Sequence, residues 1–224
     1  MIFLIKELNL KIGFISGTGK EGQALAIRFG LSEHSIFIGS RDISKAELSG
    51  NQIRNILPDV EILCSDYKQT VLQSDIVFIA LPFSVVENQL TPLKNELKGK
   101  YIVDTTVPLS LNKGKFTRLS GLKESVSQFL YNLLPDSHII SSFHTLSHLD
   151  LKRIQKNMDH DLLYFVNDKK PESKFLELID TVKGLNPVKC GTLDLSILIE
   201  HQVPLLLNIN KQYGKSTSLK IQGL

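Results

Sequence analysis

The chain has 224 residues, a formal net charge of +3 and an ordinary share of apolar residues. This length suits one substantial domain, and the charge is too small to indicate a nucleic-acid partner. Because no run of 18 apolar residues occurs, we expect no membrane span and no membrane partner. The first ten residues are apolar but carry no basic leader or cleavage site, so we interpret them as an extension before the first strand.

Cys64 and Cys190 lie far apart and form no C-x-x-C pair. Two isolated cysteines in apolar surroundings are typical of buried thiols in a reducing compartment. We therefore expect a cytoplasmic protein, with a disulfide as the less favoured alternative.

Residues 11–41 have the order strand, glycine-rich turn, helix and strand. Apolar runs at 12–15 and 36–38 indicate the strands, and residues 24–29 continue the helix. Between them stands Gly-x-Gly-x-x-Gly, made by Gly17, Thr18, Gly19, Lys20, Glu21 and Gly22. In this context the first glycine permits the tight turn, the second lets the backbone approach a pyrophosphate, and the third lets the helix pack near the sheet. The phosphates would lie at a helix N-terminus.

The end of the second strand indicates which dinucleotide binds. Enzymes that use NAD place Asp or Glu there, whereas this chain has Ser40 and Arg41, with Lys45 shortly after. A hydroxyl, a guanidinium and an ammonium group would bind a 2′-phosphate. The sequence therefore predicts NADP(H).

Strands and helices alternate along the rest of the chain. The predicted strands cover residues 60–63, 75–81, 100–104, 137–143, 162–166 and 187–191. The predicted helices cover residues 45–56, 67–73, 84–97, 125–134, 149–158 and 172–182, and we expect an exposed loop at 110–120. This alternation predicts an α/β fold with a doubly wound parallel sheet, the NAD(P)-binding Rossmann fold.

Residues 193–209 form a long apolar stretch that contains Pro204. We expect a helical segment that packs over the sheet or against a second subunit. The whole chain, 1–224, would be one domain, with residues from about 185 to 224 as a small C-terminal helical lobe. Within the sheet, ligands bind at the carboxyl ends of strands, so Leu81, Pro82 and Val107 should face the cofactor.

The histidines do not indicate a catalytic or metal-binding site. His144 and His148 straddle the junction of a strand and a loop, so their spacing defines no metal-binding face and we predict no metal site. General acid–base work by His144 is open, but a hydrogen-bonded structural role is favoured. His201 is expected in the core or an interface. Because no Gly-x-Ser-x-Gly, Walker lysine or Ser-Tyr-x-x-x-Lys relay occurs, we predict no catalytic residue.

Together these motifs resemble the NADPH-dependent reductases of coenzyme F-420. The resemblance covers nearly the whole chain. Its motifs are the glycine turn, Ile38 to Arg41 with Lys45, Asp75-Ile76-Val77, Leu81-Pro82, Val107-Pro108, His144-Thr145, Gly191-x-Leu193 and Pro204 to Ile209. The chain differs from the family pattern at Phe83, Val85, Ser147 and His148, and in the tail after Gly214.

The resemblance implies hydride transfer between NADPH and the 5-deazaflavin ring of coenzyme F-420, in a Rossmann-type homodimer. It places the pyrophosphate at Thr18 to Glu21, the 2′-phosphate at Ser40, Arg41 and Lys45, and the nicotinamide near Leu81, Val107 and His148. His144 and Ser218 would face the co-substrate. Hydride transfer between two bound rings needs orientation more than acid catalysis. Two alternatives remain: another acceptor, such as a flavin, a metal chelate or an imine, and an NADPH-binding sensor without turnover.

Overall fold

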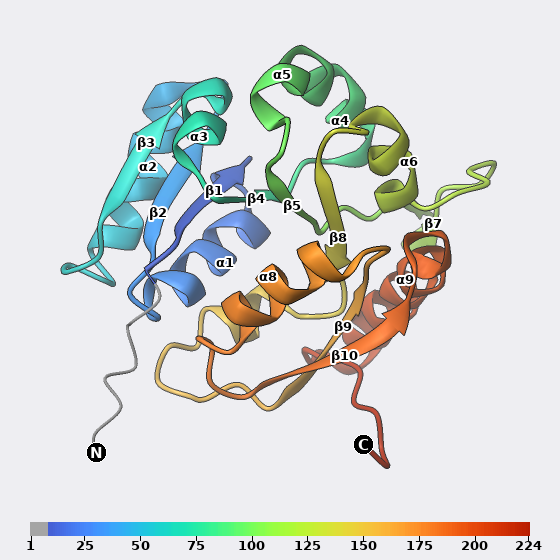
Figure 1. Ribbon diagram of the computed structural model, residues 1–224. Coiled ribbons are helices and arrows are strands. Elements are labelled where there is room, and N and C mark those ends of the chain that lie inside the picture. Colours follow the sequence, from blue (N-terminus) through green and yellow to red (C-terminus); the bar gives the residue numbers. More distant parts are fainter. Residues whose placement is uncertain (1–8) are drawn as a thin grey trace, which may run out of the picture.

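The computed structural model describes residues 9–224, and within this range eight strands form one central sheet (Figure 1). Their order across the sheet is β10-β9-β8-β5-β4-β1-β2-β3. The strands are β1 (Lys11–Ile15), β2 (Ser35–Gly39), β3 (Ile62–Ser65), β4 (Ile76–Ile79), β5 (Tyr101–Asp104), β8 (His138–Ser142), β9 (His160–Phe165) and β10 (Leu185–Gly191). The predicted doubly wound sheet is confirmed. It is not wholly parallel, because β8 pairs with β9 antiparallel while β9 and β10 run parallel to each other.

Helices cover both faces of the sheet. They are α1 (Lys20–Gly30), α2 (Ile43–Arg54), α3 (Tyr67–Gln73), α4 (Phe83–Leu90), α5 (Lys94–Leu97), α6 (Val126–Leu133), α7 (His148–Leu151), α8 (Lys169–Ile179) and α9 (Ile197–Tyr213). Strand β4 shows how the two layers share the sheet, since Ile76 and Phe78 pack into one apolar cluster and Val77 and Ile79 into the other. A strand buried on both faces needs a continuous apolar run, which is what the sequence provides.

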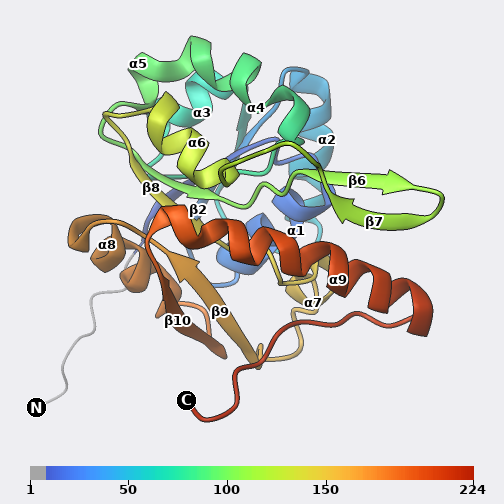
Figure 2. The same cartoon turned by 90° about the vertical axis from the view of Figure 1, so that its right-hand side faces the viewer.

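One expected loop is regular structure. Residues 110–120 fall largely in the hairpin of β6 (Leu109–Asn112) and β7 (Lys115–Arg118), which projects from the body of the protein (Figure 2). Lys113 and Gly114 both have positive φ, 48° and 76°, as a two-residue type I′ turn requires. The hairpin lies against α9.

Other differences concern helix boundaries. The helix predicted at 84–97 is divided into α4, a 3-10 turn at Thr91–Leu93 and α5, and Pro92 lies in that turn. The helix predicted at 149–158 is only the short α7. Helix α9 continues through Pro204 and ends at Gly214, whose φ of 60° gives a left-handed cap. The predicted N-terminal extension falls largely on residues 1–8, outside the described residues.

The structure differs in part from the expected places of three side chains. His201 is exposed on α9, so it does not lie in the core, and its place in an interface stays a prediction. Cys64 and Cys190 are unpaired, but both are half-buried and not fully buried.

Among the helices of residues 9–224, none combines the length and the apolar character needed to cross a bilayer.

Candidate functional site

A cavity of about 490 Å³ opens at the carboxyl ends of four neighbouring strands, β1, β4, β5 and β8. Its opposite wall is α9 and the tail that follows it. The lining residues are Ser16, Gly19, Glu21, Ala80–Pro82, Thr105–Val107, Leu109, Phe143–Leu149, Val203, Leu206, Leu207, Asn210 and Lys215–Thr217. Ligands of open α/β sheets bind at this edge. Of the expected site residues, Gly19, Glu21, Leu81, Pro82, Val107, His144 and His148 line the cavity.

The glycine turn has the close packing that the motif predicts. A Cβ on Gly22 would lie 2.7 Å from the carbonyl oxygen of Ser16, so only glycine lets α1 start this near β1. A Cβ on Gly19 would meet Ser16 O at 3.5 Å, which is an ordinary contact. The fold therefore does not require glycine at 19. The free space there adjoins the cavity and suits the close approach of a ligand.

The basic end of β2 lies beside the glycine turn and outside the cavity lining. The Gly17 N–H donates to Gly39 O at 3.3 Å, which holds the two segments together. Ser40 is buried, whereas Arg41 and Lys45 are exposed. Asp42, for which the sequence pattern predicts no role, caps α2 and lies 4.0 Å from the Lys45 ammonium group.

Glu21 is in the first turn of α1 and carries a buried carboxyl oxygen, Oε1, without a hydrogen-bond partner among the described residues. Burial raises the pKa of this carboxyl from 4.5 to about 8. A helix N-terminus favours the charged form by only about 0.3–1 kcal/mol, less than the ~1.4 kcal/mol that corresponds to one pKa unit. Desolvation therefore dominates, and Glu21 is mostly neutral at neutral pH.

His144 follows β8 and is 8% exposed. Neither ring nitrogen has a hydrogen-bond partner within residues 9–224, so the expectation of a hydrogen-bonded structural histidine is wrong. Burial lowers its pKa from 6.5 to about 4, and a backbone contact with Thr106 that falls outside hydrogen-bond geometry opposes this. His144 is a neutral imidazole that faces the cavity with both nitrogens unused.

The loop after β5 is fixed by the buried carboxylate of Asp104. Its oxygens accept from the Thr106 N–H at 3.0 Å and from Ser127 Oγ at 2.6 Å. Burial raises its pKa to about 6, and these hydrogen bonds act in the other direction. Thr106 Oγ1 lines the cavity region and lacks a partner among the described residues. Asp104 thus positions the loop that presents Thr106 and Val107.

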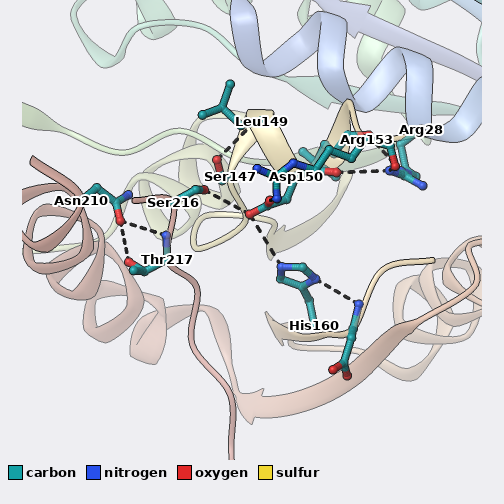
Figure 3. Close-up of polar contacts among 11 residues, drawn as sticks. Arg28, Ser147, Leu149, Asp150, Arg153, His160, Asn210, Ser216 and Thr217 are labelled. Carbon is teal, nitrogen blue, oxygen red and sulfur yellow. Dashed lines mark hydrogen bonds and ion pairs between the residues drawn. The ribbon is translucent and has the colours of Figure 1, made fainter. Parts of the chain in front are cut away.

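The turn after His144 is held from both of its ends. Ser147 caps α7 by accepting from the Leu149 N–H at 3.2 Å. At the other end, the buried Arg28 of α1 donates to the carbonyl oxygens of Asp150, Leu151 and Arg153 at 3.2, 2.9 and 3.0 Å (Figure 3). His148 begins α7, and burial together with Lys20 and Lys152 lowers its pKa, while Asp150 opposes this. The sequence pattern placed Arg28 on α1 and gave no sign of this role.

The chain after α9 turns back below α9 toward α7 (Figures 2 and 3), and Lys215–Thr217 of this tail line the cavity. Ser216 Oγ donates to Asp150 Oδ2 at 3.1 Å, and Asn210 Oδ1 accepts from the N–H and hydroxyl of Thr217 at 2.9 and 2.7 Å. Farther along, the Ile221 N–H donates to Asp161 at 2.6 Å. Ser216 and Thr217 line the cavity, whereas the expected Ser218 is half-buried beside it.

The remaining expected residues do not line the cavity. They are Gly17, Thr18, Lys20 and Gly22 of the glycine turn, together with Ser40, Arg41 and Lys45. Within residues 9–224, no group of three or more His, Cys, Asp or Glu side chains is arranged to hold a metal ion. The open space at Gly19 and the unpartnered atoms of Glu21, Thr106 and His144 fit a polar ligand that extends from the glycine turn toward β8.

Comparisons with known proteins agree with this arrangement. Residues 11–108 match the family model described as "NADP oxidoreductase coenzyme F420-dependent". The F420-dependent NADP reductase of Methanocaldococcus jannaschii is 32% identical over 222 residues, which cover 96% of this chain and 99% of the relative. That of Methanothermobacter thermautotrophicus (strain Delta H) is 27% identical over 213 residues, covering 92% of each chain.

A crystal structure of a candidate F420-dependent NADP-reductase from Arthrobacter sp. FB24 has the same fold, with a TM-score of 0.81 at 19% identity over 95% of this chain and 99% of that one. The sequence matches extend over nearly the full length of both partners. The chain belongs to the family of F420-dependent NADP reductases.

Proposed function

We propose that this protein is an oxidoreductase that transfers a hydride between NADPH and coenzyme F-420. The observation that carries the proposal is the glycine turn that opens onto a cavity with a second wall made by α9 and the tail. The turn suits a dinucleotide, and the second wall leaves a place for another ring. The names of the relatives identify that ring as the deazaflavin.

Each part of NADPH has a place in the proposal. Gly17 to Gly22 would hold the pyrophosphate, and Ser40, Arg41 and Lys45 would bind the 2′-phosphate. Leu81, Pro82, Val107 and His148 would surround the nicotinamide. His144 and Ser218 would face coenzyme F-420.

When bound, the two cofactors supply the hydride donor and acceptor, and the protein supplies position and exclusion of water. Val203 and Leu206 of α9 are buried on the cavity wall, where their apolar side chains limit the entry of water. His144 stays neutral, so it would offer a hydrogen bond to a ring and not a charge. No residue is assigned a proton-transfer step.

Three further properties belong to the proposal. The chain would be one domain, with residues from about 185 to 224 as its C-terminal lobe, and β10 of that segment lies in the central sheet. It would form a homodimer, which is supported by Leu198 and Leu205 standing 58% and 52% exposed on α9. It would work in the cytoplasm, where the unpaired Cys64 and Cys190 would remain thiols.

The test is anaerobic oxidation of NADPH by the purified protein with coenzyme F-420, followed by loss of the deazaflavin's visible absorbance. FMN and FAD serve as parallel acceptors. We expect bleaching with F-420 and little oxidation with the flavins. Tight NADPH binding without bleaching would contradict the choice of acceptor and would favour another acceptor or a sensor role.

A further inference from the structure

Glu21 presents an acidic group where the proposed function places the most negative part of the cofactor. It is the second residue of α1, two positions after Gly19 of the glycine turn, and it lines the cavity. Its Oε1 atom is buried, and no described residue donates to it. A carboxyl group in this setting is available to a ligand and to protons.

The two protonation states of Glu21 would treat a pyrophosphate in opposite ways. A carboxylate can only accept hydrogen bonds, and at short range in a partly desolvated cavity it repels another anion. A neutral carboxyl has an O–H that can donate to a phosphate oxygen. A dinucleotide that enters the glycine turn therefore selects the neutral form.

We propose that Glu21 couples NADPH binding to proton uptake, so that the cofactor binds with its pyrophosphate next to a neutral Glu21 side chain. This inference rests on the proposed use of NADPH. Because burial raises the pKa of Glu21 to about 8, the free protein carries the neutral carboxyl at neutral pH and loses it in mildly alkaline solution. The affinity for NADPH is then highest near neutral pH, and it decreases as the pH rises above the pKa of Glu21.

Other charged or titratable groups around the cavity come from different elements. His144 after β8 and His148 of α7 have lowered pKa values and are neutral in this pH range. Lys215 of the tail lines the cavity, and Lys20 is next to Glu21 on α1. Burial is the single cause of the shift at Glu21, so none of these groups sets its pKa. The effects of these groups on NADPH binding persist when Glu21 is replaced, so they can be distinguished from the effect of Glu21.

The test is a titration of the wild type and of Glu21→Gln with NADPH, followed by the fluorescence of the reduced nicotinamide, from about pH 7 to about pH 9.5. The range starts above the second ionisation of the 2′-phosphate, whose pKa is about 6. In the wild type the dissociation constant should increase toward about tenfold per pH unit above the pKa of Glu21. In Glu21→Gln it should stay within about twofold, because glutamine has no charge to lose.

Calorimetry in two buffers with different ionisation enthalpies measures the protons taken up directly. Near pH 8.5 the wild type should take up most of one proton per NADPH, and Glu21→Gln almost none. Glu87→Gln is the matched control, since Glu87 is exposed on α4 outside the cavity, and it should behave as the wild type. A second neutral variant, Glu21→Leu, should also lose the pH dependence.

The outcomes separate this inference from the proposed function. Tight binding of NADPH with the same pH dependence in wild type and Glu21→Gln would overturn the inference and leave the NADPH assignment intact. Absence of NADPH binding at every pH would overturn both. A wild type whose affinity is unchanged across the range would also contradict a role for Glu21.

Discussion

At the scale of single residues, the raised pKa of Glu21 also has a consequence for stability. The folded protein holds the proton until about pH 8, whereas an unfolded chain releases it near 4.5. Between these values the folded state binds more protons, so the free energy of unfolding decreases as the pH rises through this window.

Replacing Glu21 with Gln removes this decrease of the free energy of unfolding with pH. We expect Glu21→Gln to be about 1–3 kcal/mol more stable than the wild type at pH 9 and equally stable at pH 4. The estimate is below the value for the full shift, because part of the side chain is accessible to solvent. Thermal unfolding at the two pH values measures the difference. An equal gain at pH 4 would show that the charge of Glu21 is not the cause.

Arg41 tests the choice between NADP(H) and NAD(H). Its exposed guanidinium group at the end of β2 would contact only the 2′-phosphate, which NADH lacks. Arg41→Ala should weaken NADPH binding by about tenfold or more, the value of a charge-assisted hydrogen bond, and change NADH binding by less than about twofold. Fluorescence titrations with both cofactors provide the comparison. An equal loss for the two would contradict the assignment of this strand end.

At the scale of elements, Arg28 connects α1 to α7. Its side chain is 5% exposed and donates to the Leu151 carbonyl, to which no backbone N–H of the described residues donates, and to the Asp150 and Arg153 carbonyls, which also accept from backbone N–H groups. Arg28→Met keeps the apolar packing but removes these hydrogen bonds and leaves the buried Leu151 carbonyl without a donor. We expect a loss of about 2–3 kcal/mol and faster hydrogen exchange at residues 148–156.

Arg153→Ala is the control for this change. Arg153 forms an ion pair with Asp150 at 2.8 Å, but its side chain is 60% exposed. Exposed pairs of this kind contribute less than about 1 kcal/mol. Equal destabilisation by the two variants would mean that the buried hydrogen bonds of Arg28 have no special importance.

The hairpin, α6 and α9 are joined by a buried ion pair between Arg118 and Glu200. The Nε and Oε2 atoms are 2.8 Å apart, and the side chains are 4% and 1% exposed. Glu200 also accepts from the Val126 N–H at 2.6 Å. Burial raises the pKa of Glu200 to about 7, while Val126 and Arg118 act to lower it.

Replacing only Arg118 should lower the free energy of unfolding more than replacing both residues of the pair with neutral ones. Arg118→Met leaves a buried carboxylate without its partner and should destabilise the fold by about 3–5 kcal/mol. Adding Glu200→Gln should restore part of that loss, because the amide oxygen can still accept from Val126. Denaturant unfolding of the single and double variants measures the two free energies of unfolding. A double variant that is less stable than Arg118→Met would argue against the unpaired charge as the cause.

At the scale of the whole molecule, the parts that could be predicted are those with local signals. The glycine turn and the continuous apolar runs of the buried strands, such as Ile76 to Ile79, are patterns among residues that are close in sequence. These patterns predict the sheet and the place of the cofactor. The contacts of Arg28 and Glu200 could not be predicted, because their partners lie 122–125 and 74–82 residues away. The hairpin was missed because its exposed polar residues and lysines resemble a loop, although Lys113-Gly114 was a turn signal.

The cavity itself is a property of the whole chain, since its walls come from the first strand, the middle of the sheet and the last ten residues. The tail has no helix or strand and is attached near the cavity by hydrogen bonds to Asp150 and Asn210. It lines the cavity together with α9, and among the described residues no hydrogen bond joins it to the glycine turn that would hold the pyrophosphate. The tail should therefore affect the co-substrate more than NADPH.

Truncation after Gly214 tests this division. We expect the KM for coenzyme F-420 to increase by about tenfold, equivalent to ~1.4 kcal/mol, while the Kd of NADPH changes by less than about twofold. Ser216→Ala removes only the hydrogen bond to Asp150 and should give a smaller effect in the same direction. If truncation weakens both ligands equally, the tail maintains the cavity as a whole, and its residues do not belong to the co-substrate side.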